Sequence, residues 1–216
     1  MRRILLLITL ILLLTSTWMA LTKGRIEGPP ANPDSPVRNI IYAHVPSSIC
    51  SLLCFTILLI ASVGYLATNK QSWDRLALAS AQVGTVFATI LNLTGSIFSR
   101  AEWGPWWYPT PRLVFAAVLW FLYVVYHILR SSLPGSKQRK ARVCAVFAII
   151  AFLDVPMVLI SARFMDDIHK ADFSFDNGSQ RIAFFMAVAA TILFAAMLIW
   201  IKTDILKLQD RLEEDA

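Results

Sequence analysis

The chain has 216 residues, of which 57% are apolar or aromatic (AVILMFWYC) and only 16% are charged. Soluble domains carry about 25% charged residues, so this composition excludes a soluble enzyme, a disordered chain and a nucleic-acid-binding domain. The 20 basic and 14 acidic residues give a net charge of +6, which in so apolar a chain acts mainly on membrane orientation. The sequence predicts an integral membrane protein.

Six apolar segments are long enough to cross about 30 Å of hydrocarbon as helices, and none alternates like a barrel strand. The first has the basic start of a signal peptide, but the bulky Trp18 stands where a cleavage site needs a small residue, which favours a retained anchor. We expect an all-α integral membrane protein, one polytopic domain over residues 1–216, with helices near Ile4–Leu21, His44–Ala67, Leu76–Phe98, Arg112–Leu129, Val143–Ala162 and Ile182–Ile201.

Lysine and arginine are distributed unevenly between the connections of these helices. If the N-terminus is cytoplasmic, 12 basic residues lie on the cytoplasmic side and 8 on the other, and Arg130–Arg142 alone has five with no acid. Such a loop is typical of the cytoplasmic face. We therefore expect both termini in the cytoplasm, with the tail at about 202–216 continuing the last helix as a solvated amphipathic end.

With six helices, the first, third and fifth connections share one face of the membrane. The first ends at His44 and the fifth carries His169. The third, at about 99–112, holds three tryptophans within five residues, Trp103, Trp106 and Trp107. Two histidines and a tryptophan cluster are therefore predicted at one membrane surface.

Two interpretations of this cluster stay open at the level of the residues. Tryptophans gather at membrane interfaces as belts, and a loop histidine is commonly just solvated. A dense tryptophan cluster interrupted by glycine and proline also suits a large planar ligand, and two imidazoles could supply both axial ligands of a haem iron. The arginines that could then pair with propionates are Arg38, Arg100 and Arg112.

Other polar positions inside the apolar segments invite structural interpretations. Asp154, beside Pro156 in the fifth segment, either meets backbone groups freed near the proline or belongs to a haem path. His127 lies near the basic connection, at the surface opposite the tryptophans. We expect interhelical hydrogen bonds from three polar residues of the third helix, Asn92, Thr94 and Ser96. The three cysteines are expected to have packing roles; they are Cys50, Cys54 and Cys144.

Short motifs, in consistent order between Ile40 and Ile201, resemble the tryptophan-rich (WWD-type) haem-handling proteins of cytochrome c biogenesis. The resemblance is closest to the haem exporter protein C (CcmC) branch, whose members are six-helix proteins of about this length. The motifs are Tyr42-Ala43-His44-Val45-Pro46, Thr94-Gly95-Ser96, Trp103-Gly104-x-Trp106-Trp107, Pro111-Arg112-Leu113, and Asp154-Val155-Pro156 followed by His169.

The resemblance implies a multi-pass protein of the bacterial cytoplasmic (inner) membrane that presents transiently and non-covalently bound haem b at the outer face, and is not an enzyme. His44 and His169 would be the axial iron ligands, with Arg112 a haem or partner contact and Trp103, Trp106 and Trp107 the ring platform. The implied partners are a periplasmic haem chaperone (CcmE-like), an ABC-type membrane complex (CcmA/CcmB-like), a small membrane subunit (CcmD-like) and membrane lipid, with no nucleic acid.

The chain departs from the family pattern within the signature itself. Pro109 stands where a third tryptophan is expected, Thr110 replaces the signature aspartate, and the residues before His169 include Asp166 and Asp167 instead of aromatics. One alternative is therefore a scaffold subunit of the same assembly that does not bind haem. A membrane b-type electron-transfer cytochrome is the other, although its histidines should lie at depth on facing helices.

Overall fold

A computed structural model describes residues 2–27, 32, 34–165 and 175–215. These residues form seven α-helices and one short 3-10 helix, which make up six segments long and apolar enough to cross a membrane. The elements are α1 (Arg2–Thr22), η1 (Pro36–Ile40), α2 (Ile41–Thr68), α3 (Gln71–Trp103), α4 (Pro111–Ser132), α5 (Lys137–Ala151), α6 (Asp154–Phe164) and α7 (Gly178–Glu214). The all-α architecture with six spans is confirmed.

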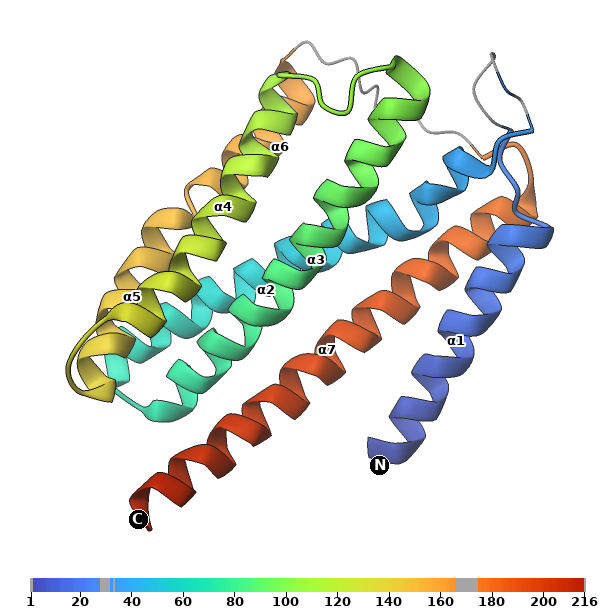
Figure 1. Cartoon of the computed structure of the whole chain (residues 1–216). Helices are drawn as coiled ribbons and strands as arrows, with labels where there is room; N and C mark the ends of the chain where they lie inside the picture. Colours follow the sequence, from blue (N-terminus) through green and yellow to red (C-terminus); the bar gives the residue numbers. More distant parts are fainter. Residues whose placement is uncertain (1, 28–31, 33, 166–174, 216) are drawn as a thin grey trace.

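The six spans run alternately up and down, so that the bundle has two distinct ends (Figure 1). At one end α1, α3 and α6 finish and η1, α4 and α7 begin; we call this the tryptophan end, because it carries Trp103, Trp106 and Trp107. The other end carries both termini and the α2–α3 and α4–α5 connections; we call this the basic end, because it includes Arg130–Arg142. That the basic end faces the cytoplasm remains a prediction from charge.

The fifth span is not the single helix that the sequence predicts over Val143–Ala162. It ends as α5 at Ala151 and resumes as α6 at Asp154. Proline lacks an N–H and its ring crowds the carbonyl four residues earlier, which for Pro156 is the carbonyl of Phe152. That carbonyl accepts a hydrogen bond from Val155 N at 3.0 Å instead, in a tighter turn. The break therefore follows from one proline.

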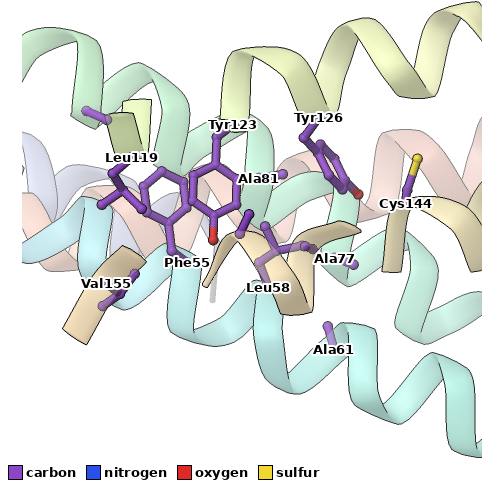
Figure 2. Packing of buried hydrophobic residues seen from close by; sticks show 13 residues of the cluster. Phe55, Leu58, Ala61, Ala77, Ala81, Leu119, Tyr123, Tyr126, Cys144 and Val155 are labelled. Atoms are coloured by element: carbon purple, nitrogen blue, oxygen red, sulfur yellow. The ribbon is translucent and has the colours of Figure 1, made fainter. Parts of the chain in front are cut away.

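The main core lies where α2 and α3 pack against α4 and the α5–α6 span. The rings of Phe55 and Tyr123 stack with centroids 3.7 Å apart, and both side chains are fully buried (Figure 2). Many of the residues around them are alanines, and small residues let helices approach closely in a membrane. The buried members are Phe55, Leu58, Ala61, Ala77, Ala81, Ala88, Leu119, Tyr123, Tyr126, Cys144, Ala148, Ala151 and Val155.

The close approach of α2 and α3 depends on a glycine. A Cβ at Gly84 would lie 2.7 Å from Cε1 of Phe55 and 2.9 Å from Cβ of Cys54. Cys50 and Cys54 are buried in a second packing cluster, which α2 and α3 form with α7. Cys144 lies in the main core. The packing role predicted for all three cysteines is confirmed.

The basic end is joined by ion pairs between helices. Asp74, in the first turn of α3 and only 7% exposed, receives two hydrogen bonds from the guanidinium of Arg130 on α4, both at 2.6 Å. Beyond the apolar part of α7, Asp210 pairs with Arg75 and Lys137, each at 2.9 Å. The tail thus continues the last helix, as predicted, and contacts the starts of α3 and α5.

Candidate functional site

His44 lies at the tryptophan end, in the first turn of α2, with its half-buried ring against α3. Its Nδ1 is 3.0 Å from Oγ1 of Thr94. A Cβ at Gly95 would lie 3.2 Å from Cε1 of His44, so the ring rests against the backbone of α3 at this glycine. Of the three polar residues named on the third helix, Thr94 makes the predicted interhelical bond, whereas Asn92 bonds to Ala88 O of its own helix.

The tautomer of His44 follows from the hydroxyl that it meets. Thr94 Oγ1 lies 2.6 Å from Ile90 O and donates its one proton to the backbone of its own helix. The oxygen therefore accepts from His44, which places a proton on Nδ1 and the basic lone pair on Nε2. Neutral imidazole with its lone pair on Nε2 is a common form in which histidine binds a metal.

The segment that leads into α2 is held by several hydrogen bonds. Tyr42 donates from its hydroxyl to Gly24 O at 2.6 Å, and Asn39 Oδ1 accepts from Ile26 N at 2.9 Å. The buried Gln180 of α7 donates to Arg25 O at 3.0 Å. The entry to the helix that carries His44 is therefore tied to the segment that follows α1, and α7 holds the same segment through Arg25.

Arg38 is tied to the tryptophan segment by an ion pair that the sequence does not reveal. Its guanidinium forms a forked interaction with Glu102, in which Nε lies 3.2 Å from Oε2 and the second nitrogen contacts Oε1. Glu102 is the residue before Trp103, so η1 and the end of α3 are joined next to the cluster. The charge of Arg38 is thus largely balanced within the chain.

The three tryptophans differ in exposure. Trp103 is half-buried and packs edge-on against Phe98, with ring centroids 5.5 Å apart. Trp106 and Trp107 are 61% and 47% exposed, in the irregular segment between α3 and α4, and the guanidinium of Arg100 lies over the ring of Trp106. Trp103 and Thr94 are nine residues apart on α3, so about 13 Å of helix axis separates this tryptophan from the threonine that His44 contacts.

The remaining predicted site residues lie at the same end of the fold or outside its description. Arg112 is the half-buried second residue of α4, directly after Pro111 at the first helical position. His169, with Asp166 and Asp167, lies outside the described residues. The neighbouring helix α7 does begin at this end, where Asn177 Oδ1 accepts from Gln180 N at 2.9 Å.

His127 lies on α4, near the basic end, and also contacts a threonine of α3. Its Nε2 is 3.0 Å from Thr85 Oγ1, and its ring packs edge-on against Tyr126. One helical turn along α3, Thr89 Oγ1 accepts from Trp120 Nε1 at 2.8 Å. Thr85 and Thr89 were not predicted as contact residues, and their only signal in the sequence is a spacing of four between threonines on an apolar helix.

Asp154 opens α6 inside the membrane-spanning region. Its Oδ2 is buried without a hydrogen-bond partner among the described residues, and so is the hydroxyl of Tyr123 in the adjoining core. The described contacts therefore include no hydrogen bond between this carboxylate and the backbone groups freed near Pro156.

Within the described part of the chain, no group of three or more histidine, cysteine, aspartate or glutamate side chains could hold a metal ion. A conventional tetrahedral or carboxylate metal centre is therefore not assembled from these residues. A haem iron needs only axial side-chain ligands, because the porphyrin supplies the other four nitrogens. His44 is suited to such a role by its tautomer and its position.

The comparisons with known proteins agree on one family. Residues 1–214 match the family model described as "Heme exporter protein C" (CcmC). Relatives of the same description come from Bradyrhizobium diazoefficiens, 27% identical over 73% of this chain and 62% of the relative, and from Escherichia coli K12, 28% identical over 61% and 53%. A "Putative cytochrome c biosynthesis ccmC-like mitochondrial protein" of Marchantia polymorpha is 26% identical over 73% of this chain and 65% of its own length. These alignments span roughly half to two thirds of the relatives' length.

Proposed function

The chain belongs to the haem exporter protein C family, and from this premise we propose that it presents haem at the outer face of the bacterial cytoplasmic membrane during cytochrome c maturation. Haem is its cargo, held transiently between the axial ligands His44 and His169 and passed to a periplasmic haem chaperone of the CcmE kind. The role requires no covalent chemistry from this chain, which we class as a non-enzyme.

The observation that carries this proposal is the contact between His44 Nδ1 and Thr94 Oγ1. The hydroxyl of Thr94 accepts from Nδ1, so the lone pair of the imidazole is on Nε2, the nitrogen suited to bind iron. The ring is half-buried at the end of a span and not at mid-membrane depth. This placement favours a surface carrier over a membrane b-type electron-transfer cytochrome.

Exposed tryptophans support release as well as binding. Trp106 and Trp107 present large apolar surfaces to the surroundings of the bundle, and a porphyrin lying against such rings would bury apolar area on both sides. With Trp103 they form the proposed platform. A site at the bundle surface lets an aqueous acceptor reach the cargo, which a core site would prevent.

Arg112 is the proposed contact for a haem propionate or for the chaperone. A guanidinium fork matches a carboxylate in two hydrogen bonds, and Arg112 lies at the start of α4 at the tryptophan end. Arg38 is a weaker candidate than the sequence suggests, because Glu102 occupies its guanidinium.

The proposed partners follow from the family. Besides the chaperone, they are an ABC-type membrane complex of the CcmA/CcmB kind, a small membrane subunit of the CcmD kind and the surrounding lipid. Large apolar side chains remain exposed along the helices, as a lipid- or subunit-facing surface requires.

One observation favours a second function, a scaffold subunit that has lost haem binding. Thr110 stands where the family signature has an aspartate, and its hydroxyl oxygen is buried without a hydrogen-bond partner among the described residues. Pro109 likewise replaces a tryptophan. A carboxylate and an aromatic contact that would serve a haem site are thus missing.

The visible spectrum of the detergent-purified protein, oxidised and reduced, distinguishes these functions. With ample haem supply, we expect a low-spin, bis-imidazole spectrum in the wild type and its loss in a His44→Ala/His169→Ala double variant. A wild-type protein without haem under the same conditions would overturn the carrier proposal, and the scaffold function would then be favoured.

A further inference from the structure

Three threonines of α3 bind nitrogen atoms of rings on neighbouring helices. The partners come from α2 at the tryptophan end and from α4 deeper in the bundle. The pairs are Thr94 with His44 Nδ1 at 3.0 Å, Thr89 with Trp120 Nε1 at 2.8 Å, and Thr85 with His127 Nε2 at 3.0 Å.

In each pair the direction of the hydrogen bond is set by the threonine. Every one of these hydroxyls lies within hydrogen-bond distance of the carbonyl four residues earlier: 2.8 Å for Thr85 to Ala81 O, 2.8 Å for Thr89 to Thr85 O, and 2.6 Å for Thr94 to Ile90 O. A hydroxyl has one proton, and here it goes to the helix backbone. Toward the rings, the oxygens act as acceptors.

The two histidines are consequently held in opposite tautomers. His44 donates from Nδ1, which leaves its lone pair on Nε2, at the far side of the ring from its own backbone. His127 donates from Nε2 to Thr85, which leaves its lone pair on Nδ1, beside its own Cβ. The two lone pairs thus differ in position: that of His44 points away from its own backbone, and that of His127 lies beside it.

The ring of His44 is also fixed in orientation. Thr94 holds one edge through Nδ1, and the absence of a side chain at Gly95 lets Cε1 approach the helix. A ring held at two points loses little further freedom when it binds. Metal-bound histidines commonly donate their second N–H in this way, which fixes the tautomer and makes the ligand more basic.

We propose that Thr94 is the positioning residue for His44: its hydroxyl selects the Nδ1–H tautomer, orients the ring and raises the basicity of Nε2 toward the haem iron. This inference rests on the proposed function. It assigns to Thr94 no contact with haem, so its effects should appear in the strength and the electronic character of the iron bond.

Thr94→Val tests the inference, because valine keeps the shape of threonine and removes the acceptor. We expect haem binding to weaken by about 10- to 100-fold, the range for loss of such a supporting contact. We also expect the midpoint potential of bound haem to rise, because a less basic imidazole stabilises ferric iron less. Thr94→Ser keeps the hydroxyl and should restore both properties.

Thr89→Val is the matched control. It removes the same kind of hydrogen bond one turn or more further along the same helix, from Trp120, and should leave haem affinity and potential at wild-type values. If Thr94→Val folds poorly, Thr94→Ala, which removes the hydroxyl with a smaller side chain, is titrated with haem in its place.

The outcomes separate this inference from the proposed function. Wild-type affinity and potential in Thr94→Val, while His44→Ala loses haem, would overturn the role of Thr94 and leave the carrier proposal standing. Equal losses in Thr94→Val and Thr89→Val would also overturn it, as a general effect on α3. Full haem retention by His44→Ala would instead remove the ligand assignment itself.

Discussion

The two ends of the bundle differ in the balance between ion pairs and exposed rings. At the basic end, charged side chains join helices directly: Asp74 with Arg130 across α3 and α4, and Asp210 with Arg75 and Lys137. At the tryptophan end one ion pair, Arg38 with Glu102, joins η1 to α3, and beyond it His44 lies against Thr94 while the rings of Trp106 and Trp107 are exposed.

In the proposed function, this difference separates stability from cargo handling. A buried, forked ion pair is costly to break, so the basic end fixes how the helices are arranged. The exposed rings of Trp106 and Trp107 contribute little to folding, but in the proposed function they offer a surface that a planar ligand can cover and leave. Substitutions at the two ends should therefore affect different measurements.

The largest expected effect on stability is at the basic end. Asp74→Asn removes the charge that compensates Arg130 in a mostly buried pair and should lower the free energy of unfolding by about 3–5 kcal/mol. Denaturant titration of the helical circular dichroism in detergent measures this. Lys137→Ala, at a half-exposed pair, should cost less than about 1 kcal/mol.

Haem content per folded molecule should be unchanged in Asp74→Asn. A variant that unfolds at wild-type denaturant concentration, or one that folds normally but loses haem, would break the proposed division between the ends.

Two glycines of α3 provide a sharper comparison within one helix. Gly84→Ala forces a methyl group against Phe55 and Cys54 and should lower the free energy of unfolding by about 1–3 kcal/mol. Gly95→Ala meets only the ring of His44, at 3.2 Å. It should leave stability nearly unchanged and reduce bound haem by displacing that ring.

Both glycine variants are compared by the same unfolding titration and by the haem absorbance of the folded protein. The reverse pattern, with haem loss in Gly84→Ala and instability in Gly95→Ala, would contradict the assignment of His44 to the cargo site.

The smallest effect on stability is expected for the exposed tryptophans. Trp106→Ala and Trp107→Ala should change the free energy of unfolding by less than about 0.5 kcal/mol, because both side chains are exposed, yet both should release haem faster to an apo-acceptor. Trp18→Ala, at an equally exposed tryptophan of α1, is the control. Equal acceleration in the control would favour the belt interpretation.

Much of the fold was predictable because it depends on segment properties. The length of the apolar segments predicted the six spans. Because the first and third connections share one face of the membrane, the end of the first connection was expected at the same end as the tryptophans, without knowledge of any contact. The break at Phe152–Leu153 was missed although Pro156 is its cause, because many membrane helices bend at proline without ending.

The site was less predictable, because its contacts depend on helix rotation. Which face of α3 meets α2 or α4 decides that Thr94 and Thr89 bind rings while Asn92 bonds to its own helix. The ion pairs of Glu102 and Asp74 depend on the same rotations. Asp74 lies just before the predicted apolar segment Leu76–Phe98, where the sequence gives no signal of its partner.

The most direct test compares the two histidines that α3 holds in opposite tautomers. His44→Ala and His127→Ala are purified in detergent from cells with ample haem, and the bound haem is measured from the visible spectra per molecule of folded protein. We expect His44→Ala to lose most of the low-spin haem signal and His127→Ala to keep it. Retention by His44→Ala together with loss in His127→Ala would contradict a cargo site at the tryptophan end.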